Sequence, residues 1–146
     1  MIIKPSINDY KELIRVWEDS VRATHNFITE EDIQFYKPLI LNEYFKVVNL
    51  LCNKDEKLKI NGFMGIVEDK LEMLFIDSVD FCKGIGKKLL IHAITEYKVK
   101  KVDVNEQNEQ AVGFYKHMGF IVVKRSEVDP WGKNFPILFM ELIRDK

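Results

Sequence analysis

The stretch from Leu71 to His92 constrains the fold most, because it combines a strand, a turn and a helix start in one short run. Leu71–Ile76 is mostly large and apolar, as in a buried strand, and Asp77–Asp80 interrupts it. Gly84 and Gly86 then precede apolar residues at helical spacing. The free N–H groups and the positive dipole end of such a helix start favour an anion. The spacing alone fits a phosphate site and a plain turn equally well.

Two common phosphate-binding motifs do not fit these glycines. A Walker loop requires a glycine five residues before Gly86, where Phe81 stands, and Ser or Thr after its lysine, where Lys88 follows Lys87. A Rossmann fingerprint requires a small residue three positions after Gly86, and Leu89 occupies that position. The glycine turn therefore belongs to neither motif.

Length and composition predict one cytosolic, soluble domain over residues 1–146. The net charge of −1 provides no broad basic face, which argues against nucleic-acid binding. No apolar run is long enough to span a membrane, and Lys4 and Pro5 interrupt any signal-peptide pattern. Cys52 and Cys82 form neither a disulfide framework nor a metal cluster, so we expect no metal.

The hydrophobic pattern predicts a mixed α/β (α+β) domain with helices on both faces of one sheet. We expect strands over residues 1–4, 46–53, 59–68, 71–76, 101–104, 120–128 and 135–143, and helices that begin near Asp9, Thr29, Gly84 and Asn108. The second to fourth strands follow one another as an antiparallel meander. Asp9 with Glu12 forms a possible capping box, and Gly62 and Gly65 suggest a bulge or a close approach.

This order of elements, with two motifs, resembles the GCN5-related N-acetyltransferases, the GNAT superfamily. The first motif is Leu74–Asp77 followed by Gly84-Ile85-Gly86. The second and more specific motif combines Asn108, Ala111, Phe114-Tyr115 and Gly119-Phe120. Three further segments, 20–25, 105–115 and 125–129, resemble a bacterial subgroup of this family. The chain departs from the family at Phe81, where Arg or Gln is usual.

The resemblance implies a GNAT-like fold with a central mixed, mostly antiparallel twisted sheet of about seven strands, splayed between the fourth and fifth. It also implies acetyl-CoA as cosubstrate, with the pantetheine arm in the gap and the pyrophosphate on the glycine turn. The residues expected to bind acetyl-CoA are Phe75, Ile76, Cys82, Lys83, Gly84, Ile85, Gly86, Lys87, Asn108, Phe114 and Tyr115. Because Phe81 replaces the usual Arg or Gln, we expect pyrophosphate binding to depend more on backbone N–H groups and on Lys83, Lys87 or Lys88.

Acetyl transfer to an amine needs a neutral nucleophile, because a lysine ammonium has a free pKa of about 10.4. Tyr115 occupies the family position of the acid that protonates the leaving thiolate, although most tyrosines on an apolar stripe are core residues. Asp103 and Glu72 are candidate bases, and either also fits a solvated acid at a strand end. Acyl transfer through Cys82 is a weaker alternative, because no His lies nearby in sequence.

The acceptor is expected to be a primary amine, in a small molecule or a protein lysine. His25, Phe27 and Glu127 are the candidate acceptor residues, because the family places its acceptor between the first two helices and the last strand loop. Direct transfer in a ternary complex, by a monomer or homodimer, is the main hypothesis. The alternative is a sensor or interaction protein that binds CoA or acetyl-CoA without catalysis.

Overall fold

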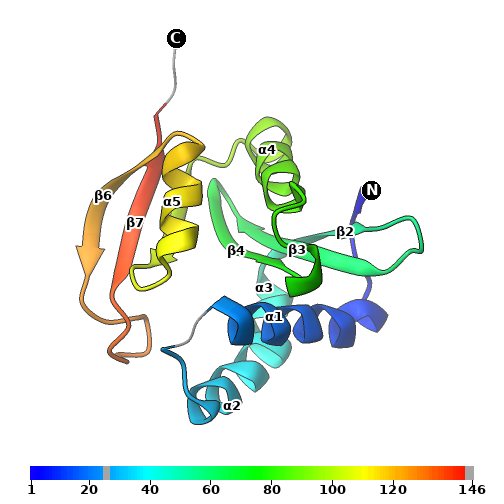
Figure 1. Cartoon of the computed structure of the whole chain (residues 1–146), viewed down its shortest axis with the longest axis horizontal. Coiled ribbons are helices and arrows are strands. Elements are labelled where there is room, and N and C mark those ends of the chain that lie inside the picture. Colours follow the sequence, from blue (N-terminus) through cyan, green and yellow to red (C-terminus); the bar gives the residue numbers. More distant parts are fainter. Residues whose placement is uncertain (25–26, 144–146) are drawn as a thin grey trace. The chain divides into compact units, whose positions relative to one another are not determined.

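An antiparallel meander forms the centre of the first of two compact units into which the chain divides, Met1–Val99 and Lys100–Lys146. Figure 1 shows the computed structural model, which describes residues 1–24 and 27–143. The strands of this unit are β1 (Ile2–Ile3), β2 (Asn49–Lys54), β3 (Ile60–Val67) and β4 (Lys70–Ile76). Neighbours in this order pair antiparallel, so the predicted meander is confirmed.

Two helices cover the opposite faces of this sheet. Helices α1 (Tyr10–Thr24) and α4 (Ile85–Tyr97) both contact β3 and β4, and Figure 1 shows them on opposite sides of these strands. The apolar residues Leu13, Ile14, Trp17 and Val21 of α1 are buried. Because both faces are covered, β3 is buried at every position from Ile60 to Ile66.

The capping box predicted at Asp9 and Glu12 is wrong. The chain enters α1 through a short 3-10 turn, η1 (Ile7–Asp9), and the box joins Ser6 to Asp9, with the Ser6 N–H 2.9 Å from Asp9 Oδ2. Glu12 instead accepts a hydrogen bond from the Ile60 N–H at 3.0 Å. Its carboxylate therefore ties α1 to the start of β3, a contact that local spacing does not reveal.

The second helix begins as predicted, and the helical path continues beyond it. Thr29 caps α2 (Glu30–Leu39), and the Asp32 N–H donates to Thr29 Oγ1 at 3.1 Å. Pro38 does not stop the helical path, which continues through a π-helical turn, η2 (Ile40–Tyr44), into α3 (Phe45–Val47). The strand expected from residue 46 therefore begins only at residue 49.

Helix α3 exists because its aromatic residue is a core residue. Phe45 is 1 % exposed and meets Phe63 of β3 edge to face, with 5.8 Å between ring centroids. An apolar run such as residues 45–51 fits a helix or a strand equally well by pattern. Packing on β3 decides the outcome for its first three residues.

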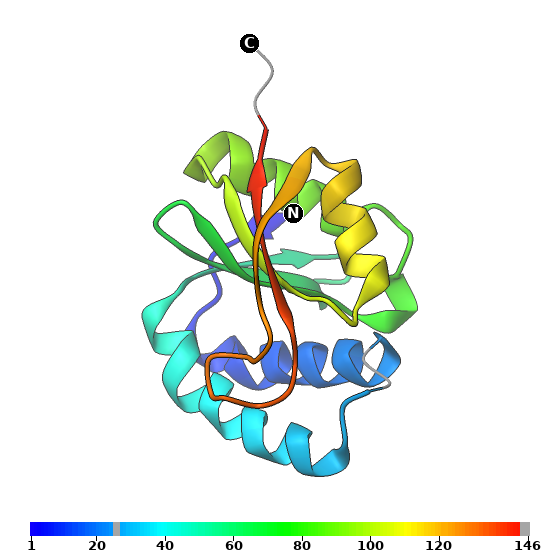
Figure 2. The same ribbon diagram turned by 90° about the vertical axis from the view of Figure 1, so that its left-hand side faces the viewer.

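The second unit is a three-stranded antiparallel sheet with one helix. Its elements are β5 (Lys101–Asn105), α5 (Glu109–His117), β6 (Phe120–Ser126) and β7 (Ile137–Leu142). Strand β7 pairs with both β5 and β6, and α5 contacts β5 and β6. Figure 2 shows the orange β6 and the red β7 crossing near the centre of the view. Gly119 ends α5 with a φ of 101°, as predicted.

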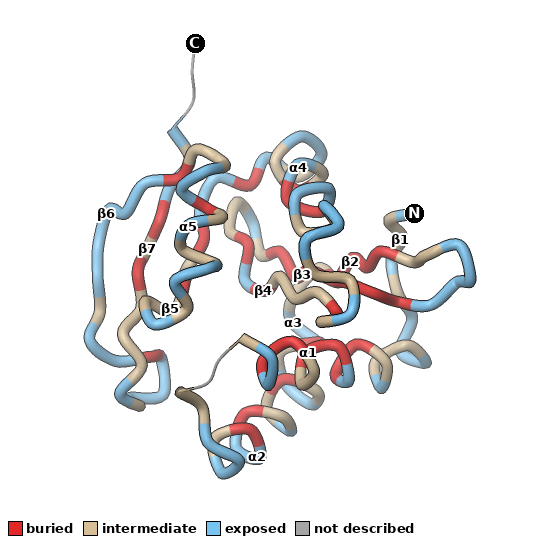
Figure 3. Tube along the Cα trace, in the orientation of Figure 1, coloured by how far each residue is buried: buried red, intermediate tan, exposed pale blue. Residues whose placement is uncertain are grey.

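Buried positions lie on β2, β3, β5 and β7 and on α1, whereas β6 is mostly exposed, as the tube in Figure 3 shows. The fully buried large side chains include Phe63, Met64 and Leu71 in the first unit and Phe120 and Met140 in the second. The described elements thus include the seven predicted strands, and the predicted fold class is confirmed. The splay between the fourth and fifth strands concerns strands of different units and stays a prediction.

Candidate active site

The turn between β4 and α4 presents backbone N–H groups without acceptors. A 3-10 turn, η3 (Ser78–Asp80), comes first, and the left-handed residues Cys82 (φ 65°) and Gly84 (φ 82°) follow. The Phe81 N–H donates to Ser78 O at 3.2 Å, and the next backbone bond runs from the Lys88 N–H to Gly84 O at 3.0 Å. Among the described residues, no acceptor receives the N–H groups of residues 82–87 between these bonds. This arrangement suits a phosphate at a helix N-terminus.

The lysines around this turn have different partners. Lys83 Nζ lies 3.1 Å from Asp80 Oδ1, and Lys88 Nζ donates to Asn53 Oδ1 of β2 at 3.0 Å. Lys87 is exposed on the first turn of α4. Among the described residues Lys87, unlike Lys83 and Lys88, has no side-chain hydrogen bond or ion pair, so its charge is free near the turn.

Gly62 explains how the start of α4 comes close to the end of β4. It pairs with Ile76 across the β3–β4 ladder. A Cβ at this position would lie 2.9 Å from Ile76 Cδ1 and 3.0 Å from Ile85 Cγ2. The close approach suggested by this glycine is confirmed, and it places the glycine turn directly beyond Phe75 and Ile76.

Glu72 lies in a β-bulge of β4. Gly65 pairs with Met73 and Ile66 with Leu71, so Glu72 is the extra residue. Its side chain is exposed, and Lys70 Nζ lies 3.5 Å from Glu72 Oε2. A bulge changes the direction of its side chains, so Glu72 does not follow the regular alternation of side chains between the two faces of β4. A role as base and a role as a solvated acid both fit this position.

In the second unit, Asn108 and Tyr115 occupy the ends of one short helix. Asn108 caps α5, because its Oδ1 accepts from the Ala111 N–H at 3.2 Å. Tyr115 is buried, with ring centroids 5.1 Å from Phe114 and 5.7 Å from Phe120. Burial raises the pKa of the Tyr115 hydroxyl above its ordinary value of 10. The phenol is therefore protonated at neutral pH and can donate a hydrogen bond.

The structure does not bring Asp103 to the same face as Tyr115. Asp103 pairs with Phe139, whereas Val102 and Val104 pair with Met140 and Leu138 and are buried. Through β7 the ladder places Val102 on the same face as Phe120, against which Tyr115 packs. Asp103 therefore lies on the opposite face of this sheet, where it is half-buried.

The acceptor candidates have different surroundings. His25 lies outside the described residues, and Phe27 is half-buried just before α2. The side chain of Glu127 is 89% exposed, and its carboxylate lies 3.7 Å from Arg125 Nη1. The following loop is organised by Asp129, whose Oδ1 accepts from the Trp131 N–H at 3.0 Å and from the Lys133 N–H at 2.8 Å. Glu127 thus lies just before a loop that is ordered by hydrogen bonds to Asp129.

A polar cluster joins α1 to the end of β4, and the sequence analysis did not single it out. This Asp77 cluster consists of Arg15, Asp19, Lys59, Asp77 and Ser78. Its signal in the sequence is faint: an acid directly after an apolar strand, and two charged residues four apart on α1. The residues that complete it are about sixty positions apart, so only the fold reveals the contact.

The described residues, 1–24 and 27–143, contain no group of three or more His, Cys, Asp or Glu that could hold a metal ion. None of their helices combines the length and apolar character needed to cross a membrane.

Comparison with known proteins shows the family. Residues 17–140 match the model of the acetyltransferase (GNAT) domain. The chain is 40% identical over 128 residues to peptidyl-lysine N-acetyltransferase YjaB of Salmonella typhimurium, a match that covers 88% of each chain. The apo solution structure of YjaB from Escherichia coli matches with a TM-score of 0.89 at 36% identity, over 99% of this chain and 98% of that one.

A further solved structure shares the fold. It is the PaiA N-acetyltransferase from Thermoplasma acidophilum in complex with coenzyme A, with a TM-score of 0.76 and 23% identity over 98% of both chains. The chain belongs to the GNAT acetyltransferase family. It is an N-acetyltransferase that uses acetyl-CoA as its acetyl donor, and the bacterial subgroup that its segments resemble is the one represented by YjaB.

Proposed function

We propose that this chain transfers the acetyl group of acetyl-CoA directly to the side-chain amine of a lysine in a protein or peptide. The observation that carries the choice of acceptor is the 40% identity, over 88% of both chains, to a relative named as a peptidyl-lysine N-acetyltransferase. We propose further that both units act as one acetyltransferase domain over residues 1–146. A cytoplasmic location and a monomeric or homodimeric state, expected from the sequence, belong to the same proposal.

The glycine turn is the proposed site of the CoA pyrophosphate. The N–H groups of Cys82, Lys83, Gly84, Ile85, Gly86 and Lys87 would donate to its oxygens, which fits their lack of acceptors within the described chain. Phe75 and Ile76 would offer backbone groups to the pantetheine arm, as an added strand does. Asn108 and Phe114, expected from the sequence to bind the cofactor, belong to the same proposal.

The chemistry joins nitrogen to the acetyl carbon and breaks the carbon–sulfur bond. The amine loses a proton as it attacks, and Glu72 or Asp103 is the proposed base, directly or through water. Tyr115 is proposed to donate to the departing sulfur. Because burial raises the pKa of its phenol, Tyr115 is a weak acid, and it acts mainly by hydrogen bonding to the developing thiolate.

Glu127 is the proposed recognition group for the acceptor. Its exposed carboxylate can attract a cationic lysine before the amine becomes neutral at the reacting centre. Phe27 and His25, on the segment between α1 and α2, are proposed to contact the acceptor chain.

The test is acetyl transfer to matched peptides. The chain is incubated with acetyl-CoA and a lysine peptide, its arginine twin, free lysine or spermidine, and released CoA is measured by chromatography. We expect release with the lysine peptide, none with the arginine twin, and a mass increase of one acetyl group on the lysine. A clear preference for spermidine would assign a small-molecule acceptor. Binding of acetyl-CoA without release by any amine would favour the sensor alternative.

A further inference from the structure

We propose that Asp19 of α1 is a positioning residue for acetyl-CoA: it holds the first turn of the loop that binds the pyrophosphate. The inference rests on the proposed placement of the pyrophosphate at the glycine turn. Asp19 Oδ2 accepts the backbone N–H of Ser78 at 2.7 Å, across 59 residues of sequence. Ser78 is the second residue after β4 and the first of η3. The bond therefore fixes the loop where it leaves the sheet.

The backbone hydrogen bonds that hold the loop lie over its first few residues. The Asp77 N–H donates to Asn61 O at 2.9 Å, the Asp80 N–H to Asp77 O at 2.9 Å, and the Phe81 N–H to Ser78 O at 3.2 Å. Residues 82–84 then follow before the first bond of α4. Because η3 is the last part of the loop with backbone hydrogen bonds before α4, its orientation sets the direction of the N–H groups that follow.

The neighbouring Asp77 explains why α1 can hold a carboxylate here. Asp77 is 3% exposed, and its carboxylate contacts that of Asp19. Two cations compensate this pair: Arg15 Nη1 lies 3.2 Å and Lys59 Nζ 3.6 Å from Asp77 Oδ2. Burial alone would raise the pKa of Asp19, but hydrogen bonds from the Ser78 N–H, the Ser78 hydroxyl and Asp77, with the nearby Arg15 charge, hold it below its ordinary value. Asp19 is thus an ionised acceptor.

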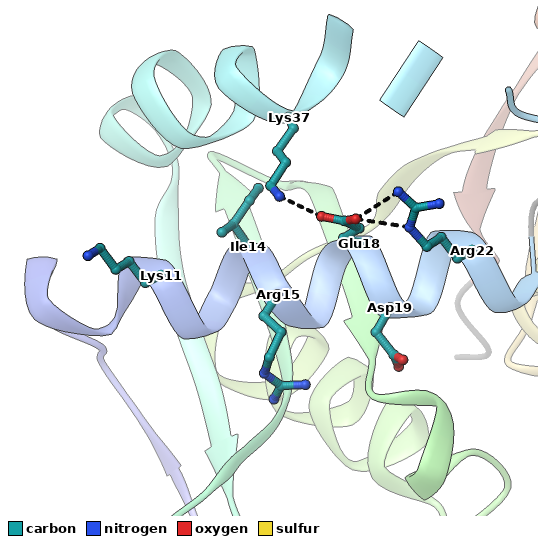
Figure 4. Close-up of a pocket in the computed structure, with 7 residues that line it drawn as sticks. All are labelled: Lys11, Ile14, Arg15, Glu18, Asp19, Arg22 and Lys37. Carbon is teal, nitrogen blue, oxygen red and sulfur yellow. Dashed lines mark hydrogen bonds and ion pairs between the residues drawn. The ribbon is translucent and has the colours of Figure 1, made fainter. Parts of the chain in front are cut away.

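The preceding residue of α1, Glu18, provides a natural control. Figure 4 shows Arg15 and Asp19 pointing away from Glu18, which points toward Lys37 and Arg22. Glu18 lies 2.6 Å from Lys37 Nζ and 2.8 Å from Arg22 Nη2. All five residues line one groove of about 470 Å³. Glu18 therefore has the same helix, charge and groove as Asp19, but it pairs with Lys37 of α2 and with Arg22 of α1 instead of the loop.

The test compares two acyl donors that differ in the 3′-phosphoadenosine diphosphate, the part that contains the pyrophosphate. Acetyl-CoA carries the pyrophosphate, whereas S-acetylpantetheine has the same thioester and no phosphate. Wild type, Asp19→Leu, Asp19→Asn and Glu18→Leu are assayed with both donors and one acceptor peptide. Asn keeps an oxygen that can accept from Ser78, whereas Leu removes the acceptor at similar size. Asp19→Ser, whose hydroxyl is too short to replace the carboxylate, is the second variant should the Leu variant fail to fold.

We expect Asp19→Leu to raise the KM for acetyl-CoA about tenfold, equivalent to about 1.4 kcal/mol, with little change in kcat. Its kcat/KM with S-acetylpantetheine should stay at the wild-type value. Asp19→Asn should retain most of the affinity, and Glu18→Leu all of it. A second substitution, Ser78→Pro, should restore the Leu variant, because the proline ring fixes φ without the N–H and Asp77 already has a compatible backbone (φ −59°, ψ 131°).

Equal losses with both donors, or an unchanged KM for acetyl-CoA in a folded Leu or Ser variant, would overturn the inference alone. A different result would contradict the proposed function itself. If the wild type uses S-acetylpantetheine as efficiently as acetyl-CoA, it does not bind the pyrophosphate. The two failures are therefore distinguished by the wild-type donor preference.

Discussion

At the scale of single residues, Tyr115 combines the packing of a buried aromatic residue with a proposed chemical role for its hydroxyl. Its ring packs on Phe114 and Phe120, as a core aromatic would, and its hydroxyl is the only part that distinguishes it from phenylalanine. Replacing the hydroxyl alone therefore separates the packing role from the chemical role.

We expect Tyr115→Phe to fold and to bind acetyl-CoA normally, with kcat lowered roughly 10- to 1000-fold, the range for losing one proton donor. The loss should shrink with an acyl donor whose thiol is a better leaving group. Steady-state kinetics with a confirmed acceptor, beside calorimetric binding of acetyl-CoA, measures both quantities. Wild-type turnover in this variant would return Tyr115 to a purely structural role.

The same hydroxyl predicts a pH dependence of stability. In the unfolded chain the phenol loses its proton near its ordinary pKa of 10, whereas burial raises its pKa in the folded chain. Above about pH 10 the folded state binds more protons than the unfolded state, so stability falls as pH rises. The contribution is complete below pH 10 and is lost above it. Between pH 9 and pH 11 the Tm of Tyr115→Phe should fall less than that of wild type. Parallel slopes would contradict the burial of the hydroxyl.

At the scale of elements, the turn from β4 into α4 connects sequence, fold and proposed function. The predicted strand, turn and glycine-gated helix all form, because their signals are local: an apolar run, a break, and a glycine in a left-handed conformation. Gly84 has open space around its missing Cβ, so a side chain there can reach into the proposed anion site.

Gly84→Asp should weaken acetyl-CoA binding by well over tenfold, which is about 1.4 kcal/mol. Gly84→Asn is the matched control, because both residues tolerate the left-handed region and differ mainly in charge. The Asn variant should lose much less affinity than the Asp variant. Calorimetric titration of both folded variants measures the difference. Equal affinities would mean that no phosphate approaches this turn.

Glycine has opposite effects in β3 and α5. A Cβ at Gly65 would lie 2.9 Å from Val48 Cγ2 and 3.2 Å from Val48 Cβ, and valine has few rotamers with which to yield. Gly65→Ala should therefore lower the free energy of unfolding by roughly 1–3 kcal/mol.

Gly113 lies in a helix with open space around its Cα, so Gly113→Ala should raise the free energy of unfolding by up to about 1 kcal/mol. Urea denaturation measures both, and a stabilised Gly65→Ala would contradict the close contact.

At the scale of the whole molecule, the chain has the GNAT fold, and most of its elements follow from the sequence. What the sequence could not show depends on distant partners. Phe45 and Val47 form a helix because Phe45 packs on β3, and Glu12 leaves the expected cap because it bonds to Ile60. The Asp77 cluster joins residues about sixty positions apart, and no periodicity records such a pairing.

Acetyl-CoA should stabilise the whole chain. A ligand that binds only the folded state at a hundred times its Kd adds about 2.7 kcal/mol, which raises Tm by roughly 5–10 °C for a chain of this size. Scanning calorimetry with increasing acetyl-CoA measures the shift, and Gly84→Asp should require much more ligand for the same effect. A Tm that stays constant at every concentration would contradict binding.

The unequal burial of the two thiols has a practical consequence. Cys52 is buried in β2, and burial raises the pKa of its thiol to about 11, whereas Cys82 is exposed within the glycine turn. The thiolate is the reactive form, so alkylating reagents discriminate between the two cysteines. The natural sequence thus already contains a selective attachment point for a fluorescent label, beside the backbone groups proposed to bind the nucleotide, and no cysteine has to be added or removed.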